Sequence, residues 1–258
     1  MRLRQICLVA PELEPAVAAL TDVLGLAVCF RDDAVAKYGL VNAVLPVGQC
    51  FLEVVAPTRP DTAAGRYMAR RGGAGGYMVI IDVADIAAAE RHVGMLGVRV
   101  ANPIAHGDAY RGLQLHPRDT GGALLELNWT RGGESLSGPY HPAGPDWQRT
   151  VRSDTTIALR GAELQSDDPA TLAARWGRIL DRPPTTMASG DPVIALDLGT
   201  LRFVPAGDGR GEGLGGIDLA VRDPAAIRDA ASARGFSVGP DWVLLCGIRI
   251  RLIGKEQS

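Results

Sequence analysis

Two glutamates lie inside apolar runs of the sequence, where a carboxylate is costly to bury without a partner. Glu53 lies in CFLEVVAP and Glu126 lies in GALLELNW. Two carboxylates that face one apolar cleft repel each other and raise a pKa, unless a cation or a ligand compensates. The alternative for Glu53 is a solvent-facing side chain, because strand alternation gives it the same face as Phe51 and Val55. The chemistry open to such carboxylates is metal binding through oxygen, or proton transfer next to a carbonyl.

Histidines and arginines near Glu126 are further candidates for a site. His116, in the segment before the Glu126 strand, is a candidate acid or base because its ordinary pKa is about 6.5. Its alternative role is structural, in anchoring the turn that follows. His106 lies in the Gly-flanked segment HGDAYRG and is a candidate for a lid. Arg111 and Arg118 are candidates for binding a carboxylate or phosphate of a substrate, although arginines are also common on surfaces.

The candidate residues recur at nearly constant spacing because the sequence repeats itself. Gln5 and Tyr77 are 72 residues apart, and Glu53 and Glu126 are 73 apart. Each pair occupies equivalent places in two successive repeats, which favours a shared cleft over isolated surface side chains.

Each repeat has the order strand, helix and then two or three strands. The first repeat predicts strands at 3–10, 26–30, 41–47 and 49–57 and a helix at 14–24. The second predicts strands at 76–83, 98–104, 112–117 and 122–129 and a helix that begins after Asp85. Two more copies follow, with helices at 168–180 and 223–235 and short strands such as 236–238. The prediction is an α+β chain of four βαβββ units in two tandem modules with curled mixed sheets.

The module boundaries follow from the repeats and from the segment rich in Gly, Pro and Ser between the second and third of them. Residues 1–130 form the first module, from units 1–73 and 74–130, and residues 154–258 form the second. The segment 131–153 is rich in Gly, Pro and Ser and is predicted to be a linker or crossing loop.

Composition excludes several classes of protein. The 258 residues carry 27 Lys and Arg against 29 Asp and Glu, so no basic surface for nucleic acid is expected. No apolar run reaches the roughly 18 residues of a membrane span, and the first residues lack the pattern of a signal peptide. The four cysteines show no CxxC spacing, which is typical of reduced, buried thiols. We expect a cytoplasmic protein that binds neither membrane nor nucleic acid.

The paired repeats resemble the vicinal oxygen chelate superfamily, which includes glyoxalase I, methylmalonyl-CoA epimerase, extradiol dioxygenases and bleomycin-binding proteins. The most specific stretch is LQLHPRDTGGALLEL at 113–127, which is similar to the epimerase segment in which HP, a basic residue and GG precede a strand with a metal-binding Glu. The resemblance implies a half-open barrel in each module, with a site in the cleft between paired units.

The resemblance also implies a metal site. Its ligand positions fall on Gln5, Glu53, Tyr77 and Glu126, of which Tyr77 departs from the expected His. Three oxygen ligands suit Mg, Mn, Ni, Co or Zn, and a divalent metal would act as a Lewis acid on the substrate. A neutral Tyr is a poor ligand, so Tyr77 is a candidate hydrogen-bond donor to a substrate oxyanion and the absence of a metal is the alternative.

The second module lacks these residues. Its equivalent positions are Gly161, Arg202, Gly215 and Arg251. No divalent site can be built from two glycines and two arginines, so we expect this module to support the first or to form the surface of a homodimer. An anion pocket around Arg202 and Arg251 is the alternative.

Three functions remain after these observations. The first is a glyoxalase-like lyase or an isomerase or epimerase that acts, with metal assistance, on a small carbonyl or carboxylate compound. Its catalytic candidates are Glu126, Glu53, Tyr77 and His116. The second is a metal-free protein of the same fold that binds a drug or metabolite. The third is an extradiol-type dioxygenase, which is disfavoured because no His occupies a ligand position.

Overall fold

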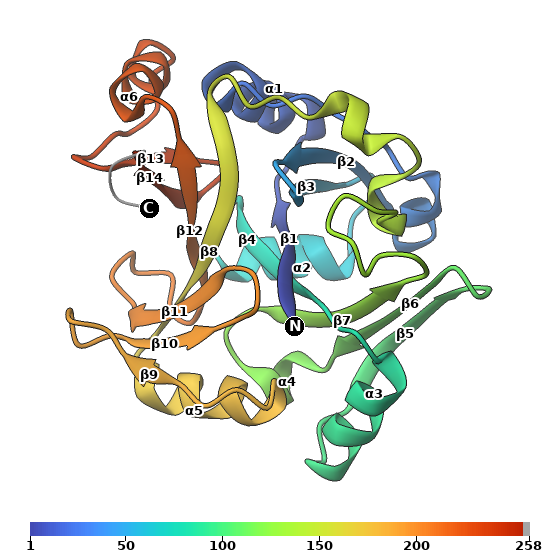
Figure 1. Ribbon diagram of the computed structural model, residues 1–258. Helices are drawn as coiled ribbons and strands as arrows, with labels where there is room; N and C mark the ends of the chain where they lie inside the picture. The colour runs from blue at the N-terminus through green and yellow to red at the C-terminus, as the bar shows by residue number, and fades with distance from the viewer. Residues whose placement is uncertain (255–258) are drawn as a thin grey trace. The chain divides into compact units, whose positions relative to one another are not determined.

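The computed structural model describes residues 1–254 and shows an α+β chain with two seven-stranded mixed sheets (Figure 1). The first sheet has the strand order β2-β3-β1-β4-β7-β6-β5, and the second has the order β13-β14-β12-β8-β11-β10-β9. The first seven strands of the chain therefore form one sheet and the last seven form the other. The predicted fold class is confirmed, with a strand–helix–strand order that recurs four times.

The first sheet and its helices have the following bounds: β1 Arg2–Val9, α1 Leu13–Leu24, β2 Leu40–Val47, β3 Cys50–Pro57, α2 Ala63–Arg70, β4 Gly75–Asp82, α3 Ile86–Met95, β5 Val100–His106, β6 Tyr110–Leu115, α4 Pro117–Thr120 and β7 Leu124–Thr130. The second comprises β8 Thr156–Ser166, α5 Pro169–Ile179, β9 Thr185–Thr186, β10 Pro192–Ala195, β11 Thr200–Pro205, β12 Gly213–Val221, α6 Pro224–Ala233, β13 Trp242–Leu245 and β14 Ile248–Ile253. Short 3-10 helices lie at Asp33–Tyr38, His141–Ala143 and Trp147–Thr150.

Aspartate caps fix the starts of three of the four repeat helices. The side chain of Asp85 accepts from the backbone N–H of Ala88, and Asp168 accepts from that of Thr171. Asp223 accepts from two successive N–H groups at the start of α6. Each carboxylate satisfies an N–H that the first turn of a helix leaves without a partner. The helix starts predicted from these residues are confirmed.

Two predicted strands are wrong as regular strands. Residues 26–30 form only an isolated bridge between Phe30 and Val44, and residues 236–238 form only a bridge between Val238 and Val243. Both segments are apolar but short, and each leaves a helix through a left-handed glycine, so pairing is confined to their last two residues. Helix α2 is an element that the apolar pattern did not predict.

The chain forms two compact units that do not coincide with the two sheets. Unit 1 comprises Met1–Gln5, Met78–His141 and Gly161–Leu214, and unit 2 comprises Ile6–Tyr77, Pro142–Arg160 and the chain from Gly215 onwards. The second and third repeats thus fall in unit 1, and the first and fourth in unit 2. The module boundaries predicted from the sequence stay a prediction.

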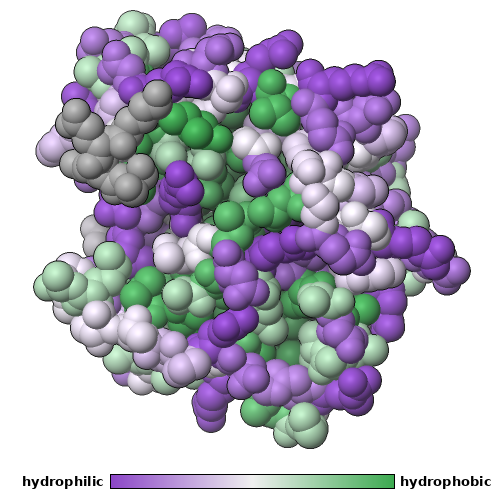
Figure 2. Space-filling view, viewed as in Figure 1, coloured by the Kyte–Doolittle hydropathy of each residue, from purple (hydrophilic) through white to green (hydrophobic). Residues whose placement is uncertain are grey.

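The core consists mainly of aliphatic side chains, as the low aromatic content predicts. Trp176 and Phe203 are fully buried and meet edge to face in unit 1, and Phe51 meets Trp147 in the same way in unit 2. Polar side chains, in purple, cover much of the face shown in Figure 2, with smaller apolar areas between them. Among the described residues, all four cysteines are free thiols, and no helix is long and apolar enough to cross a membrane.

A glycine substitution tests the packing of the β13–β14 turn in unit 2. Gly247 has a positive φ of 74°, and a Cβ built there would overlap the carbonyl group of Ala74. We expect Gly247→Ala to cost about 2 kcal/mol, more than the left-handed conformation alone. Gly235 has a φ of 78° with nothing within 4 Å, so Gly235→Ala is the matched control and should cost about 1 kcal/mol. Urea unfolding of both variants measures the difference; equal losses would contradict the contact.

Candidate functional site

Glu126 lies in the middle of β7, on one face of the sheet in unit 1. Strand register places Ile80 of β4 and Gln114 of β6 directly beside it. The next residues on the same face are Asp82 and Asn128, which are also in register. Partners in register point to the same side of a sheet, so these polar side chains gather on one face, the Glu126 face.

The Glu126 carboxylate is buried and holds a hydrogen bond on each oxygen. The Tyr110 hydroxyl donates to Oε1 at 2.6 Å, and the Gln114 amide donates to Oε2 at 2.9 Å. The carboxylate belongs to a residue that is 3% exposed. Burial raises the pKa of Glu126, and the hydrogen bonds from Tyr110 and Gln114 lower it only in part. A carboxyl group in this setting is suited to taking up and returning a proton.

Asn128 extends this network to the segment that follows β7. Its side-chain amide donates to the hydroxyls of Tyr110 at 3.4 Å and Tyr140 at 3.1 Å. Its Oδ1 is buried with no hydrogen-bond partner among the described residues. The Arg4 guanidinium lies 5.1 Å from the centre of the Tyr140 ring. Burial raises the pKa of both tyrosines well above the ordinary range, so both hydroxyls keep their protons.

Residues 132–140, which we call the strap, cover the Glu126 face in unit 1. Arg2 donates to the carbonyls of Gly133 at 2.7 Å and Glu134 at 2.8 Å, and Arg4 donates to the carbonyl of Leu136 at 2.9 Å. Within the strap only Gly133 and Tyr140 are buried. Tyr140 is thus the one large buried side chain of the strap. Arg2 and Arg4 donate to strap carbonyls, and Arg4 also lies against the Tyr140 ring. Part of the segment predicted as a linker therefore packs on the Glu126 face through Arg2, Arg4 and Asn128.

The loop between β5 and β6 ends beside this network. The His106 and His141 rings lie 4.5 Å apart, and the His141 ring stacks on Tyr110 with centroids 5.0 Å apart. His106 therefore lies near the hydroxyl-bearing ring that contacts Glu126. Arg111 points to the other face of the strand, where it donates to Glu90 of α3 at 2.8 Å. The structure does not bring Arg111 to the Glu126 face.

His116 caps the short helix α4. Its Nδ1 accepts from the backbone N–H of Arg118 at 3.2 Å, and Arg99 lies 3.4 Å from the same nitrogen. This geometry is that of the structural alternative, and the acid–base role of His116 stays a prediction. The Arg118 side chain is exposed.

The two glycines of the epimerase-like segment serve packing within unit 1. Gly121 and Gly122 both have positive φ, and a Cβ on either would meet Leu172 of α5. The N–H of Gly122 donates to Glu212 at 2.8 Å. The segment that most resembles the epimerases therefore also packs against residues of the third repeat.

The other predicted site residues lie as follows. Gln5 is buried in unit 1 and follows Arg4 on β1, so strand alternation directs it away from the face of Arg4. Glu53 and Tyr77 belong to unit 2. Glu53 accepts from the Asn42 amide at 2.7 Å, and the Tyr77 ring packs 5.0 Å from Tyr67 of α2. Burial raises the pKa of the Tyr77 phenol far above its ordinary range.

These donors do not fit a divalent metal ion. Both oxygens of Glu126 are held by neutral donors. The β4 residues that share its face include Met78 and Ile80, and Tyr77 points to the other face of the strand. The raised pKa of Tyr77 makes a phenolate ligand still more costly. Residues 1–254 contain no group of three His, Cys, Asp or Glu side chains placed to hold a metal.

Arg202 and Arg251, the two arginines predicted as an alternative anion pocket, each pair with a carboxylate. Arg202 pairs with Glu163 at 2.6 Å in unit 1, and Arg251 pairs with both oxygens of Asp218 at 2.9 and 2.8 Å in unit 2. These ion pairs leave little positive charge for an anion, so the anion-pocket alternative at these two residues is not supported.

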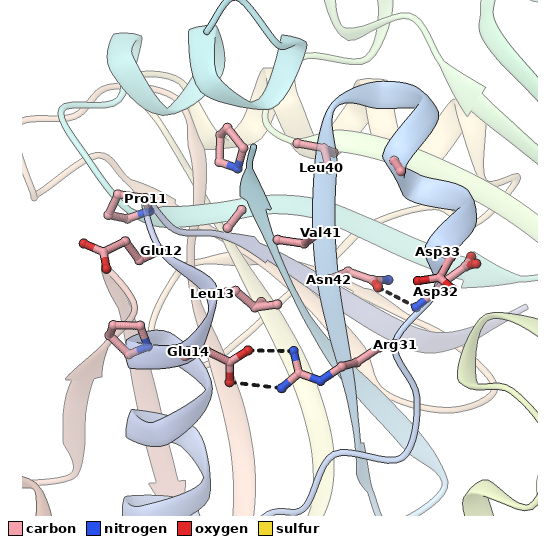
Figure 3. A pocket seen from close by; sticks show the side chains of 14 residues that line it. Pro11, Glu12, Leu13, Glu14, Arg31, Asp32, Asp33, Leu40, Val41 and Asn42 are labelled. Carbon is pink, nitrogen blue, oxygen red and sulfur yellow. Dashed lines mark hydrogen bonds and ion pairs between the residues drawn. The ribbon is translucent and has the colours of Figure 1, made fainter. Parts of the chain in front are cut away.

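A pocket of about 510 Å³ opens in unit 2 between the start of α1, the segment 31–36 and the ends of β2 and β3 (Figure 3). Its walls are both apolar and charged, and its residues are Pro11, Glu12, Leu13, Glu14, Pro15, Arg31, Asp32, Asp33, Ala36, Leu40, Val41, Asn42, Ala56 and Pro57. Arg31 pairs with Glu14 across it, and Asn42 accepts from the backbone N–H of Asp32. Its volume lies within the range of small-molecule sites.

Sequence reasoning missed the partners of Glu126. Asn128 lies two residues after Glu126 on a predicted strand, so alternation alone gives it the same face. Tyr110 lies outside the predicted strand 112–117 and reaches the Glu126 face only through the pairing of β6 with β7. Arg4 carried one usable signal, since a charged residue inside the apolar run LRQICLVA must find a buried partner. The strap could not be placed from its composition.

Comparison with known proteins gives the following. A family described as glyoxalase-like domain matches residues 6–180. The mitochondrial methylmalonyl-CoA epimerase of Mus musculus is 28% identical over 130 residues, covering 49% of this chain and 71% of that protein. A structure of a Streptomyces coelicolor methylmalonyl-CoA epimerase with 2-nitronate-propionyl-CoA is 26% identical, covering 50% of this chain and 97% of that one at a TM-score of 0.46. A hypothetical protein from Staphylococcus aureus has the same fold over 98% of this chain and 99% of its own, at 13% identity and a TM-score of 0.68.

Proposed function

Because the chain belongs to the glyoxalase-like domain family, we propose that it is an isomerase that moves a proton next to a carbonyl group, with Glu126 as the base and without a metal. The observation that carries this proposal is the buried Glu126 carboxylate held between the Tyr110 hydroxyl and the Gln114 amide. The likeness to an epimerase of 28% identity supports the same class of chemistry.

The step needs only groups of unit 1. A Glu126 oxygen takes the proton from the carbon next to the substrate carbonyl, and the C–H electron pair moves into an enolate. The Tyr140 hydroxyl and the Asn128 amide, which are hydrogen-bonded to each other, are the neutral donors that we assign to the developing negative oxygen. Glu126, now protonated, returns the proton to the same carbon or to a neighbouring one.

Gly112 lets the reacting group and its partner pack closely on β6. A Cβ at this position would lie 3.2 Å from Glu126 Oε1 and 3.0 Å from the Tyr110 hydroxyl. Glycine in this strand therefore agrees with the close approach of the Glu126 and Tyr110 side chains to the backbone of β6.

Deuterium exchange in D₂O tests the proposal. We expect the protein to exchange the C2 proton of methylmalonyl-CoA, or of a smaller 2-substituted malonyl thioester, at a rate that EDTA does not change. Mass spectrometry follows the incorporated deuterium, and Arg160→Gln, at an exposed position, is the control variant. Loss of exchange after EDTA, with recovery on adding Co²⁺ or Ni²⁺, would contradict a metal-free base.

A second candidate function is binding without chemistry, and the pocket of unit 2 favours it. Its apolar walls and its carboxylates suit a small molecule with an apolar body and a basic group. Saturable binding of such amines, abolished by Val41→Arg in the pocket wall and accompanied by no exchange with any carbonyl substrate, would favour this function over the first.

A further inference from the structure

The Glu126 face carries two arginines, Arg2 and Arg4, and the strap is hydrogen-bonded to both. Arg2 and Arg4 project from β1 to the face of Asp82 and Tyr140. Three strap carbonyls accept from their guanidinium groups at 2.7 to 2.9 Å. Arg4 is 1% exposed, so its charge is held away from water. A buried guanidinium of this kind is costly unless an acceptor of good geometry meets it.

A carboxylate meets the two guanidinium groups better than backbone oxygens do. Arg2 and Arg4 bring two positive charges to this face, and the acidic residues on it are Asp82, which is hydrogen-bonded to Arg2, and Glu126, whose pKa is raised by burial. Burial raises the pKa of Asp82 against the effect of Arg2, so this carboxylate is itself poorly solvated. A carboxylate accepts from guanidinium in a bidentate, charge-assisted way that is roughly twice as strong as a bond to a neutral carbonyl.

Asn128 gives a second, independent indication of a ligand. The side chain is completely buried, and its Oδ1 has no hydrogen-bond partner among the described residues. Turning the amide by half a rotation lets Oδ1 accept from the Tyr140 hydroxyl and directs the NH₂ group elsewhere. In either orientation, the Asn128 amide thus has one polar group that can bond to a ligand.

We propose that Arg2 and Arg4 form a carboxylate-binding subsite next to Glu126, and that an anionic substrate binds there by displacing the strap. The inference rests on the proposed function and narrows its substrate class to small carbonyl compounds with a free carboxylate. The strap holds the same arginines through Gly133, Glu134 and Leu136, so ligand and strap exclude each other. Its opening exposes Glu126 only when the anion has bound.

Malonate is the probe, with malonamide as its uncharged match. We expect isothermal titration to show malonate binding, Arg4→Gln to weaken it at least tenfold, and Arg160→Gln to leave it unchanged. Tyr140→Ala removes the strap anchor and should tighten binding severalfold, because less is needed to open the strap. Hydrogen exchange in residues 132–140 should rise with malonate and stay unchanged with malonamide.

Several outcomes overturn the subsite. They are no malonate binding by either the wild type or Tyr140→Ala, equal binding of malonate and malonamide, and unchanged binding in a folded Arg4→Gln protein. If Arg4→Gln does not fold, the Tyr140→Ala titration and the strap exchange decide. Glu126→Gln should keep malonate binding. If the wild type binds malonate but shows no deuterium exchange, the proposed function is wrong and the subsite is retained.

Discussion

Glu126→Gln should reduce deuterium exchange into a 2-substituted malonyl thioester by a factor of about 100 to 10 000, the usual contribution of a general base. The amide has the shape of the carboxyl group but cannot take a proton from carbon. Tyr110 can still donate to its oxygen, and Gln114 and Asn102 can turn their amides to meet its NH₂ group. The exchange rate, measured by mass spectrometry at saturating substrate, is the readout.

The matched variant is Glu53→Gln, at the equivalent place in the first repeat. Glu53 accepts from Asn42 in unit 2 and has no part in the proposed proton transfer, so exchange should stay within about twofold of wild type. The melting temperature of Glu126→Gln should not fall, since the substitution removes a buried carboxylate whose pKa is raised by burial. Exchange that survives Glu126→Gln, or equal losses in both variants, would remove Glu126 from the role of base.

Arg202→Met should destabilise the protein by about 3 to 5 kcal/mol, the usual effect of breaking a buried ion pair from one side. Arg202 and Glu163 face each other across β11 and β8, and their side chains are only 13% and 11% exposed. Removing the guanidinium leaves the Glu163 carboxylate in the core without the charge that it pairs with. Urea unfolding gives the free energy directly.

A double variant separates the ion pair from packing. Glu163→Leu combined with Arg202→Met should recover most of the loss, because no charge then stays buried. The exposed pair of Arg31 and Glu14, at 44% and 70%, is the control, and Arg31→Met should cost less than about 1 kcal/mol. A single-variant loss as small as that of Arg31→Met would show that the ion pair in β8 and β11 contributes little.

The repeats predict most of the fold because each carries local signals that agree. Aspartate caps, glycine stops and apolar runs place the four repeat helices and nearly all strands. The apolar pattern fails at 26–30 and 236–238, where the apolar run is longer than the backbone segment that pairs with another strand. It also misses α2, whose polar and apolar residues become a helix after the Thr62 cap.

The site is less accessible to sequence reasoning because it depends on register. Glu126 was predicted, but its neighbours Tyr110 and Gln114 are defined by the pairing of β6 with β7. A shift of one residue would send both to the opposite face. The metal set followed from resemblance alone, and no feature of composition distinguishes a ligand from a glutamate held by two neutral donors.

The pairing of repeats into units has a consequence for the order in which the chain folds during synthesis. Unit 2 begins at Ile6 and is completed only by the chain from Gly215 on, which contains α6, β13 and β14, whereas unit 1 has all its parts once Leu214 has left the ribosome. The first repeat therefore lacks its partner in unit 2 until the last repeat is made. Such long-range closure is slow and exposes the nascent chain to aggregation. A chain stopped after the predicted first module would lack the partners of both units, so chaperone dependence and poor yield are the expected behaviour of that fragment.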